Sequence, residues 1–143
     1  MIYTSYWAQV KNFPTNLVGL NSTIWPPKWR PLGKDNRGVW VIDCPPIKPG
    51  AQCNGLCNGK CSPKHPQDCD FLKNYYNQLH EIDFNDFLNR LARLGTKIKE
   101  GENLDSIDFA IIFFETPQNQ CSERAMIQKW FKENDYEIKE WHK

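Results

Sequence analysis

Apolar residues recur every three or four positions directly after residue 70 and again after residue 83, which predicts two amphipathic helices in succession. Asp70 or Asp68 is placed to cap the first helix, Asp83 is placed to cap the second, and Gly95 is expected to end it. We expect both apolar stripes to pack on a sheet. They comprise Phe71, Leu72, Tyr75, Tyr76 and Leu79, followed by Phe84, Phe87, Leu88, Leu91 and Leu94.

The run Phe109–Phe114 is apolar without alternation, which indicates a strand buried on both faces and therefore central and parallel. A polar loop then enters a helix that carries Met126, Ile127, Trp130 and Phe131. The alternation of Tyr136, Ile138 and Trp141 suggests a closing strand. Strand, helix and strand with short connections predict a right-handed parallel crossover.

The first half of the chain is less regular. Ile2–Tyr6, Asn16–Asn21 and Gly38–Asp43 are expected to form strands, whereas Trp25–Pro31 contains too many prolines to pair inside a sheet and is expected to form a rigid aromatic loop. These patterns predict one small α/β domain over residues 1–143, with a mostly parallel sheet flanked by helices.

Residues 44–69 form a cysteine-rich insert with almost no aliphatic side chains, so a bound metal ion is a plausible source of its order. A thiol or imidazole stands at every fourth position of its second part: Cys53, Cys57, Cys61, His65 and Cys69. Four thiolates, or three with His65, make a closed structural zinc site. An iron–sulfur cluster uses the same thiolates, and reduced cysteines without a metal are the remaining alternative.

The overall charge is nearly balanced, with 18 basic and 17 acidic residues, so the chain does not act as a polycation. Residues 1–69 nevertheless carry eight Lys and Arg against three Asp, together with four of the six Trp. This half could bind a nucleotide or nucleic acid, or it could be an ordinary solvated surface. No apolar run is long enough for a membrane span and the N-terminus lacks the pattern of a secretory signal, so we expect a cytoplasmic protein whose cysteines stay reduced.

The loop from Glu115 to Arg124 is the expected site, because ligands of parallel sheets bind beyond the carboxyl ends of the strands. Glu115 follows the buried strand and is a candidate general acid or base. Cys121 or Ser122 lies at the helix start, where the dipole favours a thiolate or an anion. Arg124 opposes that dipole, so it is expected to serve an anionic ligand or to pair with Glu115. The alternative is an ordinary cap at Ser122 and a solvated Arg124.

The opening strand, the helix around Tyr75, the sequence Phe113-Phe114-Glu115-Thr116-Pro117 and the helix from Cys121 to Phe131 resemble the DUF488 family of small α/β proteins from bacteria and phages. Its members are similar in having an apolar strand, a Tyr-Glu-Lys-Pro-like turn and Cys-His-Arg before a helix. The resemblance implies an enzyme-like site, and the phage setting implies nucleotide or nucleic-acid metabolism.

Glu115 and Arg124 match the Glu and Arg of the family, but the Cys-His-Arg triplet does not match. It is replaced by Cys121-Ser122-Glu123-Arg124, so that alignment on Arg124 puts the Cys on Ser122 and the His on Glu123, whereas alignment on the cysteine inserts one residue. A Cys–His pair for nucleophilic catalysis is therefore not preserved. The cysteine-rich insert is absent from the family pattern.

Two functions are consistent with these features. The first is an enzyme acting on a nucleotide, nucleoside or nucleic-acid base, with Glu115 as acid or base, Arg124 and the helix N-terminus holding phosphate, and Tyr6, Trp25 or Trp29 stacking on the base. The second is a non-catalytic, zinc-stapled module that binds nucleic acid or protein through its basic aromatic half. A pocket in which Glu115, Arg124 and Tyr6 converge would favour the first.

Overall fold

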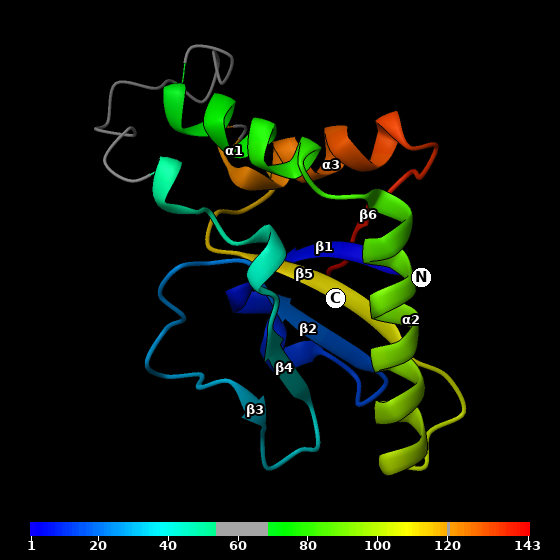
Figure 1. Cartoon of the computed structure of the whole chain (residues 1–143). Coiled ribbons are helices and arrows are strands. Elements are labelled where there is room, and N and C mark those ends of the chain that lie inside the picture. The colour runs from blue at the N-terminus through cyan, green and yellow to red at the C-terminus, as the bar shows by residue number, and fades with distance from the viewer. Residues whose placement is uncertain (54–68, 120) are drawn as a thin grey trace.

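The computed structural model describes residues 1–53, 69–119 and 121–143. Within these residues the sheet is built from six strands and is covered by three α-helices and three short 3-10 helices (Figure 1). The strands are β1 (Ile2–Tyr6), β2 (Leu17–Asn21), β3 (Gly33–Lys34), β4 (Trp40–Asp43), β5 (Asp108–Phe113) and β6 (Lys139–Glu140). The helices are α1 (Asp70–His80), α2 (Phe84–Gly101) and α3 (Glu123–Glu133), with η1 (Trp7–Asn12), η2 (Pro45–Ile47) and η3 (Ala51–Cys53) as the 3-10 helices.

The strand order is β3-β4-β2-β5-β1-β6, and all neighbours are parallel except β3 and β4. The predicted central parallel strand is confirmed, since β5 lies between β2 and β1, with Phe113 opposite Tyr6 and Ile112 opposite Asn21. The carboxyl ends of β1, β2 and β5 therefore meet at one edge of the sheet. This edge receives the loop that leads from β5 into α3 (Figure 1).

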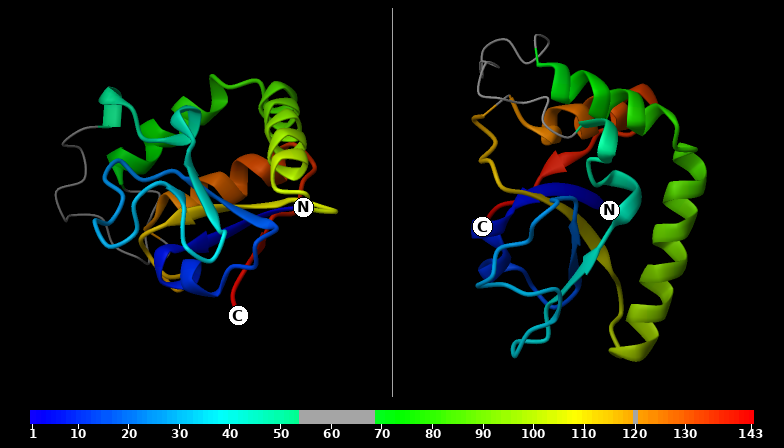
Figure 2. Two further views of the ribbon diagram at one scale, coloured as in Figure 1. Left: turned by 90° about the horizontal axis from the view of Figure 1, so that it is seen from below. Right: turned by 60° about the vertical axis from the view of Figure 1, so that its left-hand side comes forward.

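Both faces of the sheet are covered, as the unbroken apolar run in β5 requires. Phe109, Ile111 and Phe113 pack under the three α-helices, whereas Ala110 and Ile112 pack on the opposite face, where η1 lies (Figure 2). The buried side of η1 and the following segment contribute Trp7, Val10 and Phe13. Alternation of side chains along a strand thus divides the interior into two apolar clusters.

The three predicted helices are present, with two corrections at their ends. Asp83 caps α2 as expected by accepting the backbone N–H of Asp86 (2.9 Å), but α2 continues past Gly95 to Gly101. Gly95 is buried against Phe109, so its small size serves packing rather than termination. Helix α1 has Cys69 at its N-cap position instead of Asp70 or Asp68.

The strand predictions also needed changes at the sheet edges. The closing strand is confirmed but spans only Lys139–Glu140. Tyr136 and Ile138 pack instead against the apolar cluster that lies between the sheet and the α-helices. The short edge strand β3 was not predicted. The predicted ligands Cys57, Cys61 and His65 lie outside the described residues. None of the described helices has the length and hydropathy of a membrane-spanning segment.

Candidate functional site

A small pocket of about 140 Å³ lies at the carboxyl edge of the sheet. Its walls come from the loop after β5 and from the first turns of α1 and α3, which pack against each other. The N-termini of two helices therefore face one cavity, and their positive dipole ends favour negative charge there. The lining residues are Cys69, Phe71, Leu72, Glu115, Cys121 and Glu123, so sulfur, carboxylate and apolar groups share the space.

Ser122 links the start of α3 to Glu115. It is the N-cap of α3 and accepts the backbone N–H of Arg124 at its Oγ atom (3.2 Å). The same hydroxyl donates to Glu115 Oε2 (3.3 Å), so the cap orients the carboxylate. Cys121 is held by its backbone N–H, which donates to Asn119 Oδ1 (3.0 Å). The predicted residues Glu115, Cys121 and Ser122 are thus brought together.

Glu123 belongs to this site although the sequence pattern did not single it out. Burial, and secondarily the negative charge of Glu115, raise the pKa of Glu123 to about 7. A carboxyl group with this pKa exchanges its proton near neutral pH, which is the property of a general acid or base. In the sequence, a glutamate in the first helical turn is explained by its favourable charge near the helix dipole, so nothing there indicates a raised pKa.

Arg124 lies in a different environment from the one expected. Only 3% of the residue is exposed, and its Nε atom donates to Glu140 Oε1 (2.9 Å) rather than to Glu115. A second guanidinium nitrogen donates to the backbone oxygen of Ser5 (3.1 Å). Arg124 therefore ties α3 to β1 and β6, and the structure places it in an internal ion pair.

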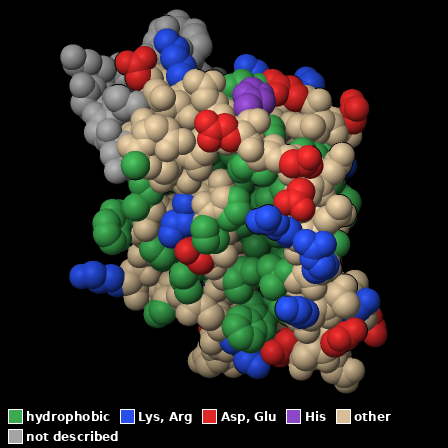
Figure 3. Space-filling model, viewed as in Figure 1, with side chains coloured by type: hydrophobic (Ala, Val, Ile, Leu, Met, Phe, Trp, Pro, Cys, Tyr) green, Lys and Arg blue, Asp and Glu red, His purple; other side chains and the backbone are tan. Residues whose placement is uncertain are grey.

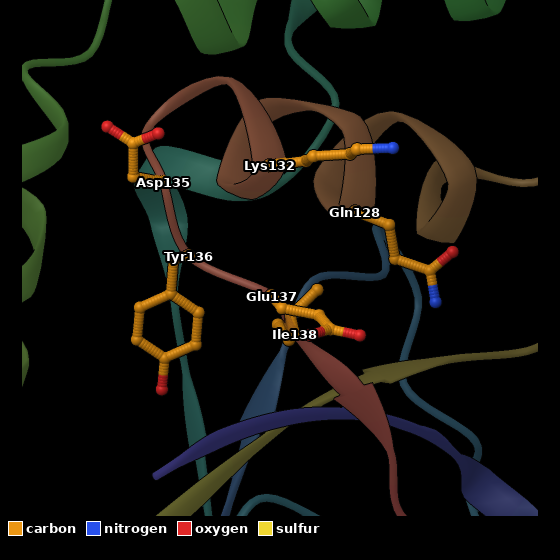
Figure 4. Close-up of a pocket in the computed structure, with 6 residues that line it drawn as sticks. All are labelled: Gln128, Lys132, Asp135, Tyr136, Glu137 and Ile138. Atoms are coloured by element: carbon orange, nitrogen blue, oxygen red, sulfur yellow. The ribbon is translucent and has the colours of Figure 1, made fainter.

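Tyr6 does not share the pocket of Glu115. Its ring lies 5.9 Å from the Arg124 guanidinium carbon, and it lines a separate depression of about 310 Å³ with Gln9, Pro117, Gln118, His142 and Lys143. Glu115, Arg124 and Tyr6 thus do not converge on one pocket. A wider, open depression of about 640 Å³ runs between α3 and the segment before β6 (Figure 4). Its walls combine polar side chains such as Gln128 and Lys132 with the apolar surfaces of Tyr136 and Ile138, and none of these residues lines the pocket at the carboxyl edge.

The predicted aromatic loop is present and its tryptophans are exposed. Trp25 is 80% exposed and Trp29 is 66% exposed. The Trp29 ring meets the buried Trp7 ring edge-on, with 6.4 Å between centroids. The ring of Phe114, next to Glu115 in the sequence, is tilted against the Trp7 ring, with 6.3 Å between centroids. The loop therefore reaches the same sheet edge as the pocket.

Two of the five predicted metal ligands are described. Cys53 ends η3 and Cys69 precedes α1, and both are buried. Helix α1 packs against η3, and Gln78 of α1 accepts the backbone N–H of Gly50 (2.8 Å). The described segments on either side of residues 54–68 are thus both held at helix α1. The described residues alone contain no group of three side chains suited to hold a metal ion, so a complete zinc site would need ligands from residues 54–68.

Comparisons of the chain with protein-family models, curated proteins and solved structures gave no significant match.

Proposed function

We propose that the protein is an enzyme that uses Glu115 and Glu123 for acid–base chemistry on a nucleotide, nucleoside or nucleic-acid base. The observation that carries this proposal is the pocket in which both carboxyl groups meet, with the pKa of Glu123 raised to about 7. In this proposal Glu123 donates a proton to a nitrogen or oxygen atom of the base, and Glu115 accepts one.

The charge of the pocket supports a base rather than a phosphate as the group that enters it. Two carboxyl groups line the cavity, and the guanidinium of Arg124 is engaged by Glu140. A phosphate would face repulsion from Glu115, whereas the N–H groups of a base could donate to it. The cavity of about 140 Å³ has room for roughly five water-sized groups, which suits one planar ring.

The resemblance to the DUF488 family and the zinc site form part of the same proposal. Cys53 and Cys69, together with Cys57 and Cys61 or His65, would hold a structural zinc ion that orders the insert; an iron–sulfur cluster is the alternative. This ion supplies structural stability and no chemical step. The exposed Trp25 and Trp29 support a second candidate function, a non-catalytic module that binds nucleic acid or protein.

The test compares Glu123→Gln and Glu115→Gln with the unmodified protein in incubations with nucleobases, nucleosides and nucleotides, followed by NMR. We expect product formation to fall by at least about 100-fold in each variant, because each loses a proton-transfer group. Glu137→Gln, on an exposed position outside the pocket, is the matched control and should keep full activity. Binding of ligand without any turnover would favour the non-catalytic module instead.

A further inference from the structure

We propose that the substrate is a single-stranded nucleic acid, held on an aromatic surface formed by Trp7, Trp29 and Phe114. This inference rests on the proposed function and names its substrate class. Trp7 is buried and forms the base of the surface, whereas Trp29 and Phe114 contact it at 6.4 and 6.3 Å and are 66% and 51% exposed. Nucleic-acid bases stack on such rings whatever their sequence.

Exposed apolar side chains are concentrated in residues 24–32, the segment that carries Trp29. Of the six large apolar side chains exposed in the described part of the chain, four come from residues 24–32 and a fifth is Phe114. In the space-filling view, separate apolar side chains lie at the surface over the loop between β2 and β3, and a larger apolar area lies between this loop and α2 (Figure 3). A concentration of this kind on a protein surface marks an interaction site more often than chance exposure.

The loop that carries Trp29 is held in place from inside. Arg30 is buried, donates to the backbone oxygen of Val39 (2.9 Å) and forms an ion pair with Asp35 (3.8 Å). The backbone N–H of Arg30 also donates to the oxygen of Pro27 (3.1 Å). Because the backbone is fixed by these bonds and by prolines, the exposed ring loses little freedom on binding. The fixed backbone of this loop is what a preformed binding surface requires.

Charge favours a polyanion as the occupant. Residues 22–34 contain three basic side chains and no acidic one. Arg30 is paired with Asp35 (3.8 Å) and Lys34 with Glu102 (3.2 Å), so the positive charge offered to an occupant comes from Lys28. Lys28 is exposed beside Trp29, where it can contact a phosphate of a stacked strand. A second copy of this chain as the occupant is an outcome of the experiment below.

The aromatic surface and the acid–base pocket are carried by neighbouring residues of one loop. Phe114 and Glu115 are consecutive residues, with Cα atoms about 3.8 Å apart. Phe114 packs on the Trp7 side of the sheet, and Glu115 lines the pocket on the helix side. A single strand that stacks on Trp29 and Phe114 can therefore cross the sheet edge and insert one base between Glu115 and Glu123, whereas a duplex keeps its bases paired.

The test measures the binding of fluorescently labelled 12-nucleotide single strands of DNA and RNA by anisotropy. We expect Trp29→Ala and Phe114→Ala each to weaken binding at least about fivefold, since stacking contributes about 1–3 kcal/mol per base. Leu32→Ala, an exposed aliphatic residue of the same loop, is the matched control and should bind within twofold of the unmodified protein. A duplex of the same sequence should bind more weakly. Circular dichroism of each variant establishes that it is folded.

Three results would overturn the inference: no binding of either single strand, equal binding by the folded Trp29→Ala and Phe114→Ala variants, or a protein dimer that Trp29→Ala dissociates. Glu123→Gln separates this inference from the proposed function. One outcome is that the unmodified protein turns over nucleosides, loses this activity in Glu123→Gln and yet binds no single strand. That result would refute only the single-stranded substrate. Strand binding without turnover would refute the enzyme and would leave the aromatic surface as a binding site for single-stranded nucleic acid.

Discussion

Glu123 and Arg124 are neighbours in the sequence but face different surroundings. Glu123 lines the pocket beside Glu115, where burial and like charge favour its protonated form. Arg124 turns inward to Glu140 and to the backbone of Ser5. Successive residues of a helix point about 100° apart, so one of them can face a cavity while the other faces the sheet.

The raised pKa of Glu123 makes the stability of the protein depend on pH. Because the folded state holds this proton more tightly than the unfolded chain, the contribution of Glu123 is lost as the pH rises from its usual pKa of 4.5 to about 7. Glu123→Gln should remove this loss and raise the free energy of unfolding at pH 8 by roughly 1–2 kcal/mol, a value reduced for its partial exposure. Urea unfolding at pH 5 and pH 8 measures the effect, and a variant as pH-sensitive as the unmodified protein would contradict it.

The Arg124–Glu140 pair should contribute mainly to stability. Arg124→Ala leaves the Glu140 carboxylate half-buried without its partner, and we expect the free energy of unfolding to fall by about 3–5 kcal/mol. Arg90→Ala, which breaks the exposed ion pair with Asp86 (3.1 Å), is the matched control and should cost less than about 0.5 kcal/mol. Chemical denaturation compares the two. A stable Arg124→Ala variant that loses only ligand binding would restore the phosphate-binding role predicted from the sequence.

For single residues, the sequence indicates the loop that lines the pocket but not the side-chain contacts of Glu123 and Arg124. Glu115, Cys121 and Ser122 could be predicted because their position after a buried strand and at a helix start is visible in the pattern. The raised pKa of Glu123 could not be predicted, because it depends on burial in the pocket shared with α1, a helix that is distant from Glu123 in the sequence. The same holds for Glu140, which meets Arg124 across the sheet.

Among the elements, β2 and α2 each contain a glycine at a packed position. A methyl group at Gly19 would lie 2.5 Å from Ile112 Cδ1 and 3.0 Å from Val41 Cγ2, both fully buried. At Gly95 it would lie 3.4 Å from the Phe109 ring, which is an ordinary contact.

Alanine should therefore have opposite effects at the two glycines. Gly19→Ala should lower the free energy of unfolding by about 1–3 kcal/mol through overpacking. Gly95→Ala should raise it by about 0.5–1 kcal/mol, because alanine favours the helix. Thermal and urea unfolding of the two variants, which differ only in position, measure the contrast, and equal effects would contradict the packing described for both.

Element types were predictable because apolar residues recur at helical spacing in α1, α2 and α3 and form an unbroken run in β5. The end of α2 was not, since a glycine near a helix end has the same appearance whether it terminates the helix or packs against a sheet. The two-residue strand β3 carries no pattern long enough to detect, and its pairing with β4 depends on the turn at Gly38, where φ is 88°.

For the whole molecule, the proposed metal site predicts how the body and the insert depend on each other. Protein purified without added metal should contain about one zinc ion per chain, and Cys53→Ser and Cys69→Ser should lose it together with part of the stability. Cys44→Ser is the matched control: this buried thiol directly follows β4 and lies outside the regularly spaced series that begins at Cys53, so we expect it not to be a ligand. Elemental analysis measures the ion. Absence of metal would refute the site, and stoichiometric iron would favour the cluster.

The overall architecture followed from the sequence more fully than the site. The unbroken apolar run of β5 requires cover on both faces of the sheet, and its alternation with helices favours parallel neighbours. The pocket required three segments from different parts of the chain to meet, the loop after β5 and the starts of α1 and α3. No local pattern encodes that meeting, so the carboxylate pair could be recognised only in three dimensions.

The two outermost strands, β3 and β6, are each two residues long, and both carry a lysine. Such short edge strands present few unpaired backbone N–H and C=O groups, and their lysine side chains would repel the same strand of an identical chain. Continuous addition of strands from one molecule to the next is therefore disfavoured. We expect this arrangement to protect the parallel sheet from fibril formation at high protein concentration.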